Sequence, residues 1–568
     1  MDRYDVAILG GGLSGLTLGL QLKKARPETS ILIVEKRKGP APHAAFKVGE
    51  SSVEMSAHYF ADVVGMRDHL EANELPKAGL RFFFPAGDNS DITRRLEWGA
   101  FALPPVPSFQ LDRGTFENAM TERNVEKGNE VRGATRVTEV DFGADGEEHT
   151  VTLDTEGDES QVRARWVVDA SGYPGIIKRK LGLQKPVEHN INSAWFRLTG
   201  GIDLEQWGAQ DAEWIGRMSE PGIRKLSTNH LMGEGYWVWL IPLGTGPISV
   251  GIVADPRFHP FEEIETWEKA LDWLKRHEPQ LAAEVEPRQD QIEDFLKVQN
   301  FAYSCQRVFS PDRWALTGIA GVFADPFYSP GSDFIAQGNT FITDLVCRDL
   351  AGEDVGRRTL QYDVQYVTSF ETAIQGTYTN HYQLFGNAQV MTAKLLWEFA
   401  AYWAVVALPF FNEKLTDLEF SASVGGEIRR IITAGARLEE MFRQWHQLGQ
   451  HEWGDAFIVN RSFPAFWQLH LDLDERFDDD ALRQKFRENA DLLEGLAVVI
   501  FHTALESLPP DDRIDADTKI NPAKISLSPE KWEKDRLFSD DGISLDEARS
   551  RTGDEVDKVL LRRQRSPA

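Results

Sequence analysis

The stretch DVAILGGGLSGLTLGLQLKKARPETSILIVE, residues 5–35, sets the expected architecture of the chain. Its apolar run at 5–9 predicts a β-strand, the apolar periodicity at 13–24 predicts a helix, and 30–35 predicts a second strand. The turn between the first strand and the helix, Gly10-Gly11-Gly12-Leu13-Ser14-Gly15, satisfies G-x-G-x-x-G in the context that gives this pattern meaning. We therefore predict a dinucleotide-binding βαβ unit.

Each glycine of this turn has its own physical role. Gly10 allows the tight turn, Gly12 lets the backbone approach a pyrophosphate, and Gly15 lets helix and strand pack closely. Free N–H groups at the helix N-terminus favour phosphates, and a carboxylate at the end of the second strand binds ribose hydroxyls. The predicted cofactor contacts of this unit are Gly10, Gly12, Leu13, Ser14, Gly15, Glu35 and Lys36. The alternative is a glycine turn that binds no ligand. The strand before the turn, the helix after it and Glu35 at the end of the second strand argue against this alternative.

NAD-binding and FAD-binding proteins share this fingerprint, so the choice between the two cofactors depends on other residues. Arg113 after one strand, and Asp169-Ala170-Ser171-Gly172 after another, resemble further flavin-contacting motifs of hydroxylase-like flavoproteins. Gly244-Thr245-Gly246 predicts a hairpin between strands and is not a second dinucleotide fingerprint. Because no separate nicotinamide-binding domain is indicated, the flavin must be reduced in a shared cleft or before it arrives.

Strings that lie far apart in the chain carry a resemblance to a known family. Residues 236–242 (YWVWLIP) contain W-x-W-x-I-P, and residues 323–331 (FADPFYSPG) contain F-x-x-P-x-x-S-x-G. Residues 48–51 (VGES) resemble a flavin-contacting loop, and residues 77–82 (KAGLRF) are similar to a segment that carries a catalytic lysine. Over roughly residues 1–345 the chain resembles the flavin-dependent halogenases, and it is closer to their phenol and pyrrole types than to their indole type.

The resemblance implies an α/β fold: a hydroxylase-like, doubly wound FAD-binding domain, an inserted antiparallel β-sheet that forms the substrate domain, and a mostly helical C-terminal region. We expect residues 1–187 to form the FAD-binding domain, with 78–110 contributing to the substrate sheet. Residues 188–300 are expected to form the substrate sheet, and 301–345 to return to the FAD-binding domain. Residues 346–568 are expected to form the helical region, ending in a polar tail that wraps the surface or hangs loose.

The resemblance also implies the chemistry. FAD as FADH2, oxygen and a halide (chloride or bromide) yield hypohalous acid, which halogenates an electron-rich aromatic substrate at Lys77. Taken alone, Lys77 would be a solvated surface lysine. The apolar strand that follows it, with Leu80, Phe82 and Phe84, predicts instead an inward ammonium whose pKa is lowered by burial.

Two further sets of site residues follow from the same resemblance. The additional cofactor contacts are Val48, Gly49, Glu50, Ser51, Arg113, Asp169, Asp325, Pro326 and Gly331. The substrate side and tunnel are assigned to Trp237, Trp239, Phe323, Tyr328 and Ser329. Trp237 and Trp239 alternate along a strand, so both face one side of it. The resemblance implies that they separate flavin from substrate, and core packing is the alternative.

Departures from the family pattern shape the expected substrate and partner. Tyr328 stands where tryptophan halogenases carry a glutamate, so we expect a phenol or pyrrole-like ring, free or tethered to a carrier protein. Gly318-Ile319 replaces a Gly-Asp flavin motif, which is consistent with a diffusible FADH2 supplied by a separate NAD(P)H-dependent flavin reductase. An aromatic monooxygenase and a flavin-binding protein without turnover are the alternative functions.

Composition sets the remaining bounds. The chain has 568 residues and a net charge of -27, which favours two or three structural units and argues against nucleic acid as a partner. The two cysteines, Cys305 and Cys347, form no CxxC, and no metal-ligand pattern occurs. Met1 leads directly into the first strand, which leaves no room for a signal peptide and favours the cytoplasm. The apolar segment Leu395 to Phe411 contains Glu398 and Pro409, so we expect a buried helix rather than membrane contact.

Overall fold

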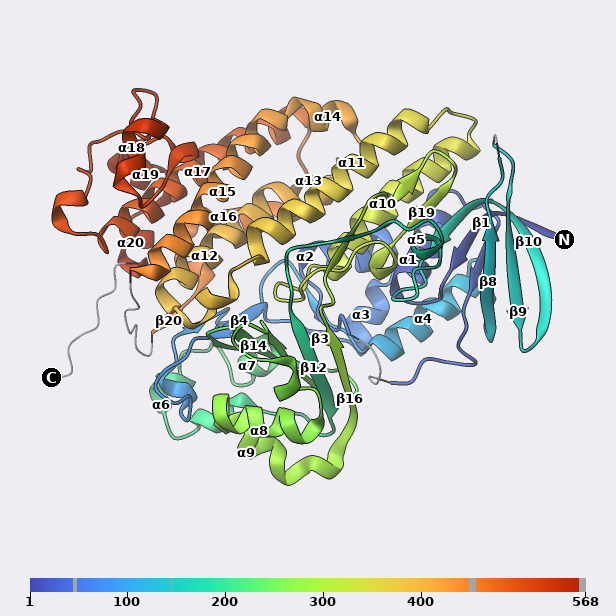
Figure 1. Ribbon diagram of the computed structural model, residues 1–568, viewed down its shortest axis with the longest axis horizontal. Helices are drawn as coiled ribbons and strands as arrows, with labels where there is room; N and C mark the ends of the chain where they lie inside the picture. The colour runs from blue at the N-terminus through green and yellow to red at the C-terminus, as the bar shows by residue number, and fades with distance from the viewer. Residues whose placement is uncertain (44–47, 145, 449–455, 561–568) are drawn as a thin grey trace.

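The computed structural model describes residues 1–43, 48–144, 146–448 and 456–560. Figure 1 shows an N-terminal nucleotide-binding region at the right, a second β-sheet below the centre, and a helical body toward the upper left. The fold class expected from the sequence, an α/β FAD-binding fold with a helical C-terminal region, is confirmed.

The first sheet is the nucleotide-binding sheet, and its central strands run parallel. Strand β1 pairs in parallel with β10 on one side and β2 on the other, and β10 pairs in parallel with β19. The strand order is β18 (Phe309–Ser310), β19 (Trp314–Leu316), β10 (Asp158–Asp169), β1 (Asp2–Leu9), β2 (Ile31–Val34) and β7 (Glu130–Arg132), with β8 (Thr135–Asp141) and β9 (His149–Thr155) joined through β10. Continuous apolar runs suit these strands because a parallel sheet is covered on both faces. Helix α1 (Leu13–Ala25) packs against α4 (Arg113–Glu126) and α10 (Gly331–Leu350).

The second sheet carries the W-x-W-x-I-P string and is mixed rather than purely antiparallel. Its order is β16 (Ile292–Gln299), β12 (Asn192–Leu198), β15 (Ile248–Ala254), β14 (Tyr236–Pro242), β13 (Thr228–Gly233), β4 (Leu80–Phe83), β5 (Glu97–Trp98) and β20 (Phe457–Ile458). Pairs β4–β13 and β5–β20 are parallel, whereas the other neighbouring pairs are antiparallel. The expectation of an antiparallel sheet was therefore only partly right. Each parallel pair joins strands separated by more than a hundred residues, and such long connections, unlike hairpins, permit parallel pairing.

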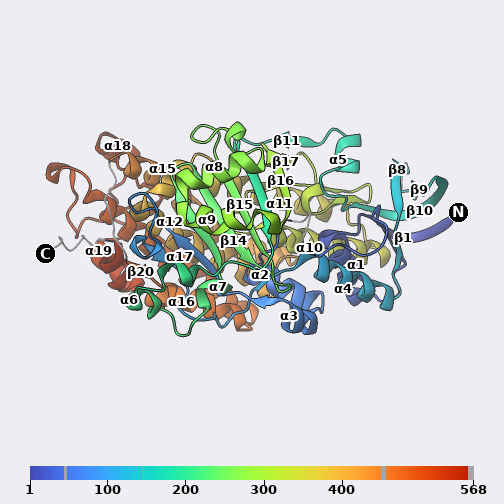
Figure 2. The ribbon, with the colours of Figure 1, turned by 90° about the horizontal axis from the view of Figure 1, so that it is seen from below.

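Alternation along β14 divides the second sheet between two cores. Trp237 and Trp239 belong to the large core shared with the nucleotide-binding region and the helical body, whereas Val238 and Leu240 belong to a separate core. The separate core is closed by α8 (Trp267–His277) and α9 (Pro279–Val285), which lie across β14 and β15 in Figure 2. The two tryptophans thus face the same side, toward the rest of the molecule.

The apolar segment near residue 400 lies inside the helical body. Helix α12 (Ala388–Ala401) continues through a π-turn at Tyr402–Ala407 into α13 (Leu408–Phe411). By length and composition Ala388–Phe411 could cross a membrane, with a mean hydropathy of 1.3, but 61% of its most apolar window is buried. It contacts α15 (Gly425–Gln447), α16 (Pro464–Leu471) and α17 (Asp479–Leu505). It also carries a fully buried lysine, Lys394, which is ion-paired to two glutamates.

The polar C-terminal tail is folded onto this body as far as residue 560. It contains α18 (Pro529–Asp535), α19 (Leu545–Thr552) and α20 (Glu555–Leu560), and both α19 and α20 contact α17. Ile520 and Val556 are fully buried, which shows that the tail contributes to the core despite its polar composition. Residues 561–568 of the tail lie outside the described residues.

One buried carboxylate ties the returning helix α10 to the first sheet. Asp349 accepts hydrogen bonds from Arg165 at 2.6 Å and from the Trp166 indole N–H at 2.8 Å, and it also contacts Arg313 at 3.1 Å. We predict that Asp349→Ala lowers the free energy of unfolding by about 1–3 kcal/mol, because the fully buried Trp166 N–H loses its acceptor. Chemical unfolding followed by tryptophan fluorescence measures the effect. Glu353→Ala, which breaks an exposed pair with Arg348 nearby, is the control and should change stability by no more than about 0.5 kcal/mol.

Candidate active site

The glycine turn leaves room for a ligand at one position only. A Cβ on Gly10 would lie 2.3 Å from the carbonyl oxygen of Ala170, and one on Gly15 would lie 2.0 Å from the carbonyl oxygen of Gly10. Both glycines are therefore required by the packing of the protein itself. A Cβ on Gly12 would meet no protein atom within 4 Å. The backbone is open at the position where a pyrophosphate is expected to approach.

The acid at the end of β2 is oriented by backbone N–H groups. The Glu35 carboxylate accepts a hydrogen bond from Gly11 N–H at 2.9 Å and another from Arg37 N–H at 2.8 Å. The neighbouring Lys36 is exposed. Glu35 thus lies directly beside the glycine turn, whereas the Lys36 side chain has no partner there among the described residues.

Arg113 joins the start of α4 to the loop at residues 48–51. Its guanidinium donates to the carbonyl oxygens of Val48 and Gly49 and to the Glu117 carboxylate. Within the described part of the chain, the buried Arg113 Nε has no hydrogen-bond acceptor. An unpaired buried donor is costly, so this side chain fits a ligand with oxygen acceptors, such as the phosphate or ribityl groups of FAD.

Three acids expected among the cofactor contacts are hydrogen-bonded within the protein. Asp169 accepts from Ser171 and from the backbone of Ile177 and so shapes its own loop. The buried Glu50 pairs with Arg197 at 2.7 Å. Asp325 is fully buried and bonded to His189, Tyr382 and the backbone N–H of Phe327. These carboxylates hold the loops in place. The side-chain partners of Glu50 and Asp325 could not be inferred from the sequence, because each lies more than fifty residues away.

Lys77 is buried, which excludes the surface-lysine alternative. It lies between β3 (Leu75–Pro76) and β4, and 2% of it is exposed. Its Nζ donates to Ser51 Oγ at 2.7 Å and to the Ser52 carbonyl oxygen at 2.6 Å. Ser329 Oγ in turn donates to Ser51 Oγ at 3.1 Å. A chain of hydrogen bonds therefore connects the lysine to the loop that precedes α10.

Two groups at this position have pKa values near neutrality. Burial lowers the pKa of Lys77 to about 7, although the charges of Glu54 and Asp333 oppose the shift. Burial raises the pKa of Asp333 to about 7, against the hydrogen bonds from Ser56 and Tyr402. The negative charge of ionised Asp333 favours the protonated form of Lys77. The site can therefore both donate and accept a proton near neutral pH.

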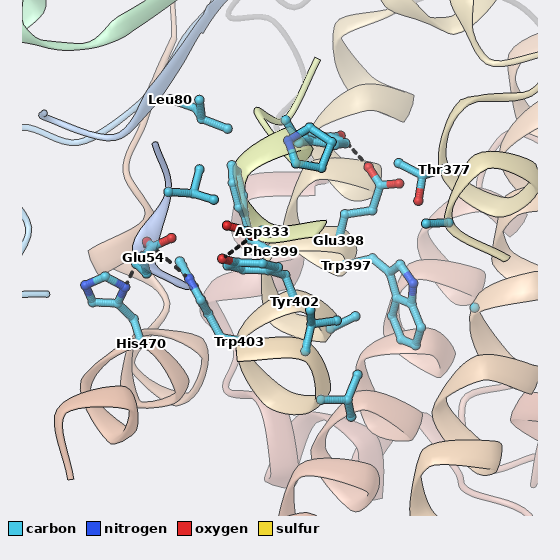
Figure 3. A pocket seen from close by; sticks show the side chains of 18 of the residues that line it. Glu54, Leu80, Asp333, Thr377, Trp397, Glu398, Phe399, Tyr402, Trp403 and His470 are labelled. Carbon is cyan, nitrogen blue, oxygen red and sulfur yellow. Dashed lines mark hydrogen bonds and ion pairs between the residues drawn. The ribbon is translucent and has the colours of Figure 1, made fainter. Parts of the chain in front are cut away.

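A large cavity of about 960 Å³ opens beside Lys77. Its polar lining includes Lys77, Glu54, Asp333, Tyr328 and Glu398, and most of its remaining wall is apolar. Figure 3 shows Glu54 with His470 and Trp403 on one side, and Glu398 with Thr377 on the other. The described lining contains neither of the two tryptophans of β14 nor Phe323.

The two tryptophans lie behind the cavity wall. The Trp237 ring packs edge-on against Phe327 at 5.3 Å between centroids, and its N–H donates to the Tyr382 hydroxyl at 3.0 Å. Trp239 donates to Ser249. Phe323 lies four residues before Phe327 and packs against Phe301. Phe327, next to Tyr328, thus stands between Trp237 and the cavity.

The helical body supplies functional groups that no sequence motif indicated. Glu54 contacts His470 and Trp403, each at 3.3 Å, and Tyr402 bonds Asp333 at 2.8 Å. These partners belong to α16 and to the π-turn after α12, where the sequence is mostly apolar and aromatic. No sequence signal pointed to them.

The sequence has a tyrosine, and no carboxylate, at position 328, but the structure brings a carboxylate to this tyrosine. The Tyr328 hydroxyl donates a hydrogen bond to Glu398 Oε2. Glu398 belongs to α12, some seventy residues farther along the chain, and it lines the same cavity. The carboxylate is therefore present, but it comes from another element.

Comparisons with known proteins agree with this geometry. The FAD binding domain family matches residues 3–249. The flavin-dependent halogenase chlA of Dictyostelium discoideum is 26% identical over 452 residues, which cover 73% of this chain and 72% of that protein. The tetracycline 7-halogenase of Kitasatospora aureofaciens is 27% identical over 358 residues, covering 58% of this chain and 61% of that one.

Solved structures show the same fold. The halogenase PltM, in complex with phloroglucinol and FAD, superposes with a TM-score of 0.60 over 89% of this chain and 97% of its own, at 17% identity. The flavin-dependent halogenase CmlS superposes with a TM-score of 0.51 over 77% of this chain and 73% of its own, at 22% identity.

The open position at Gly12 allows a direct test of the cofactor site. Gly12→Ala should fold as the wild type does, because Gly12 has an extended backbone (φ -94°) and no protein atom lies near the added Cβ. Affinity for FAD, measured by quenching of flavin fluorescence, should fall at least about tenfold, or about 1.4 kcal/mol. Gly425→Ala, where a Cβ also meets no atom within 4 Å, is the matched control and should bind FAD normally. Unchanged affinity in Gly12→Ala would place the pyrophosphate elsewhere.

The glycine turn, the oriented Glu35 and the unpaired Arg113 donor fit FAD, and the matching family is an FAD-binding one. Lys77 and Ser329 of the loop at 325–331 are both hydrogen-bonded to Ser51, so the lysine and the loop belong to one site. Its curated relatives and solved neighbours include flavin-dependent halogenases, and this chain is an FAD-binding oxidoreductase that is similar to them.

Proposed function

We propose that this protein halogenates an electron-rich aromatic ring and that Lys77 delivers the halogen. When bound, reduced FAD supplies the electrons with which oxygen and halide yield hypohalous acid. The observation that carries the proposal is the buried Lys77 ammonium, which is hydrogen-bonded to Ser51 at the wall of the large cavity.

Lys77 acts by positioning and polarising the reagent. An ammonium has three N–H donors, and among the described residues Ser51 and Ser52 accept from Lys77. A remaining donor is available to the oxygen of hypohalous acid, so the halogen becomes more electrophilic as that oxygen takes up a proton. Orientation and electrostatics of this kind, in a site shielded from water, account for most of the expected rate enhancement.

The loop that precedes α10 is the proposed halide site. Ser329 has a left-handed backbone (φ +58°), and α10 begins two residues later at Gly331. A Cβ on Gly331 would meet no protein atom within 4 Å, so its backbone is open to approach. Free N–H groups at a helix N-terminus favour anions. This arrangement supports the halide near Ser329 and Gly331.

We place Trp237, Trp239 and Phe327 in the layer between the flavin region and the cavity. Trp237 is tied through Tyr382 to Asp325 of the halide loop, and Phe327 packs against both Trp237 and Tyr328. Such a layer separates the aromatic substrate from the flavin and so favours halogenation over direct hydroxylation.

The cavity suits a phenol or pyrrole-like substrate with a large apolar portion. Its volume of about 960 Å³ is at the upper end of the range for sites that enclose drug-sized ligands. Aliphatic side chains of α11 (Gly356–Ala373) and α15, such as Val364, Ile428 and Ile431, extend the wall away from Lys77. One relative is a brominase of pyrrole-2-carbonyl groups on a peptidyl-carrier protein, from Pseudoalteromonas luteoviolacea. The ring is thus delivered either free or on a carrier.

We assign reduction of FAD to a separate NAD(P)H-dependent flavin reductase, and the cytoplasm as the compartment in which both work. The sequence contains one dinucleotide fingerprint, and it is the one assigned to FAD. The two cysteines, Cys305 and Cys347, are free. A reduced-flavin supply and free thiols are both compatible with a reducing compartment.

Replacing Lys77 should abolish halogenation without affecting flavin binding. We expect Lys77→Ala and the better space-filling Lys77→Met to lower bromination of a phenol panel by about 100-fold or more. FAD affinity and oxygen-dependent reoxidation of FADH2 should persist. Lys185→Met is the matched control, because that ammonium pairs with Glu371 at the surface and should not influence turnover.

The same assignment predicts a pH dependence. Because the donating form of Lys77 is the ammonium, the wild-type bromination rate should fall as pH rises through about 7. If Lys77→Ala forms product at the wild-type rate, Lys77 does not deliver the halogen.

The reductase assignment predicts slow use of nicotinamide by the protein alone. With FAD and NADPH but no partner, NADPH oxidation should be no faster than with free FAD, and bromination should start when a flavin reductase is added. The measurements are the NADPH absorbance and product mass spectra. Rapid NADPH oxidation by the purified protein would favour the monooxygenase alternative.

A further inference from the structure

A buried group of charges lies on the cavity wall opposite Glu54. Lys394 Nζ donates to Glu398 at 2.7 Å and to Glu439 at 2.8 Å, and Glu398 also accepts from the Tyr328 hydroxyl. Lys394 is fully buried. Tyr328, Glu398 and Glu439 all line the cavity that contains Lys77. The labelled Glu398 carboxylate is visible in Figure 3, with a dashed line to its hydroxyl partner.

The charges in this group do not balance. One ammonium faces two carboxylates, so the group either carries a net negative charge or holds an extra proton. Burial raises the pKa of Glu439 to about 8, with Lys394 opposing the shift. Burial also raises the pKa of Glu398, and Lys394 again opposes it. Burial disfavours the charge on Lys394, but the two carboxylates outweigh it and raise its pKa. The group can therefore exchange one proton near neutral pH.

Neighbouring elements add further titratable groups. Tyr378 and Thr377 of the π-turn Ile374–Tyr378 face Glu398, and Thr377 donates a hydrogen bond to it. On the far side, His381 Nε2 lies 3.4 Å from Glu439, and Arg443 contacts His381 at 2.8 Å. These groups tune the proton affinity, but Tyr328 and Glu398 are the two directly linked to each other at the cavity.

A purely structural role explains this group poorly. Buried ion pairs are weak contributors to stability, because desolvation offsets their attraction. Here an excess carboxylate is buried as well, which adds to that cost. Its position on the cavity wall, linked to a hydroxyl that can contact a ligand, points to proton transfer.

We propose that Tyr328 and Glu398 form a relay that accepts the hydroxyl proton of a phenolic substrate during halogenation. The inference rests on the proposed function and adds the substrate class, phenols with a free hydroxyl. It also assigns the proton acceptor to Glu398 of α12, which lies outside the sequence motifs that carry the family resemblance.

The proposed step is balanced as follows. The ring carbon attacks the halogen of hypohalous acid, the halogen–oxygen bond breaks, and the leaving hydroxide takes a proton from Lys77 to become water. The substrate O–H passes its proton to Tyr328 Oη, and the Tyr328 proton moves to Glu398, so the halogenated ring becomes a neutral dienone. The ring C–H proton then leaves to the Lys77 amine, and the relay returns a proton to the oxygen. The sum is aromatic C–H plus hypohalous acid giving aromatic C–halogen plus water.

The test compares a phenol with its methyl ether, which has no proton to give. Bromination of both is measured with bromide, FAD and a flavin reductase, for the wild type, Glu398→Gln and Tyr328→Phe. We expect the wild type to prefer the phenol by about 100-fold, the size of a general-base contribution. Both variants should lose most of this preference, which is measured as the ratio of the phenol rate to the methyl ether rate within each protein. Glu488→Gln, an exposed glutamate of α17, is the control and should retain the preference.

The pH profile gives a readout that a structural role would not change. In the wild type, phenol bromination should fall as pH decreases and the Glu398–Glu439 pair takes up a proton. Glu398→Gln should lack this acidic limb but keep the alkaline limb assigned to Lys77. Glu398→Gln leaves Lys394 paired with Glu439, and Tyr328→Phe leaves all three charged groups in place, so at least one variant should fold as the wild type does. Thermal unfolding midpoints and FAD affinity check this.

The outcomes separate the two proposals. If the wild type brominates neither compound, the proposed function fails. If the wild type prefers the phenol and both variants keep that preference and the acidic limb, halogenation stands and the relay is wrong.

Discussion

An ammonium that is buried away from water has to be hydrogen-bonded or give up its charge, and the site is built around this requirement at Lys77. Ser51 and Ser52 accept from its Nζ, and Ser329 extends the hydrogen bonds to the loop before α10. These hydrogen bonds do not fully replace hydration, so burial lowers the pKa of Lys77 to about 7. A lysine in this state is both an available proton donor and, after deprotonation, a base.

The two sheets have to be held in register for this arrangement to exist. Lys77 precedes β4, which joins the second sheet beside β13, whereas Ser51 and Ser329 lie in loops of the nucleotide-binding region. Thr228, the first residue of β13, contacts Ser51 Oγ at 2.8 Å and so joins the two regions. Asp325 and Glu50, each bonded to distant partners, fix the same loops. These two acids support the loops of the site, whereas the backbone at Gly12 is unobstructed and Arg113 Nε has no acceptor among the described residues.

The helical body gives the cavity both its apolar wall and its second set of charges. Without α12, α15 and α16, Lys77 and Asp333 would face solvent, and burial could not bring their pKa values toward 7. The same helices place Glu398 against Tyr328 and Glu54 against His470. Two acidic groups therefore border one largely apolar cavity from opposite sides.

Local pattern was sufficient for the βαβ unit, the strand that carries Trp237 and Trp239, and the hairpin that follows it, because strand alternation and glycine turns depend on neighbouring residues. It also indicated Lys77 and the 323–331 string, which carry the family resemblance. It could not show that Glu50 and Asp325 are already paired with Arg197 and His189. Nor could it show that the carboxylate absent at position 328 is replaced by Glu398, since that contact spans some seventy residues and two regions of the fold. The order of residues along the chain determines which faces of the helices and strands are apolar. Proton affinities depend instead on which charged groups are buried together. Only the packing of the helical body onto the two sheets brings those groups into contact.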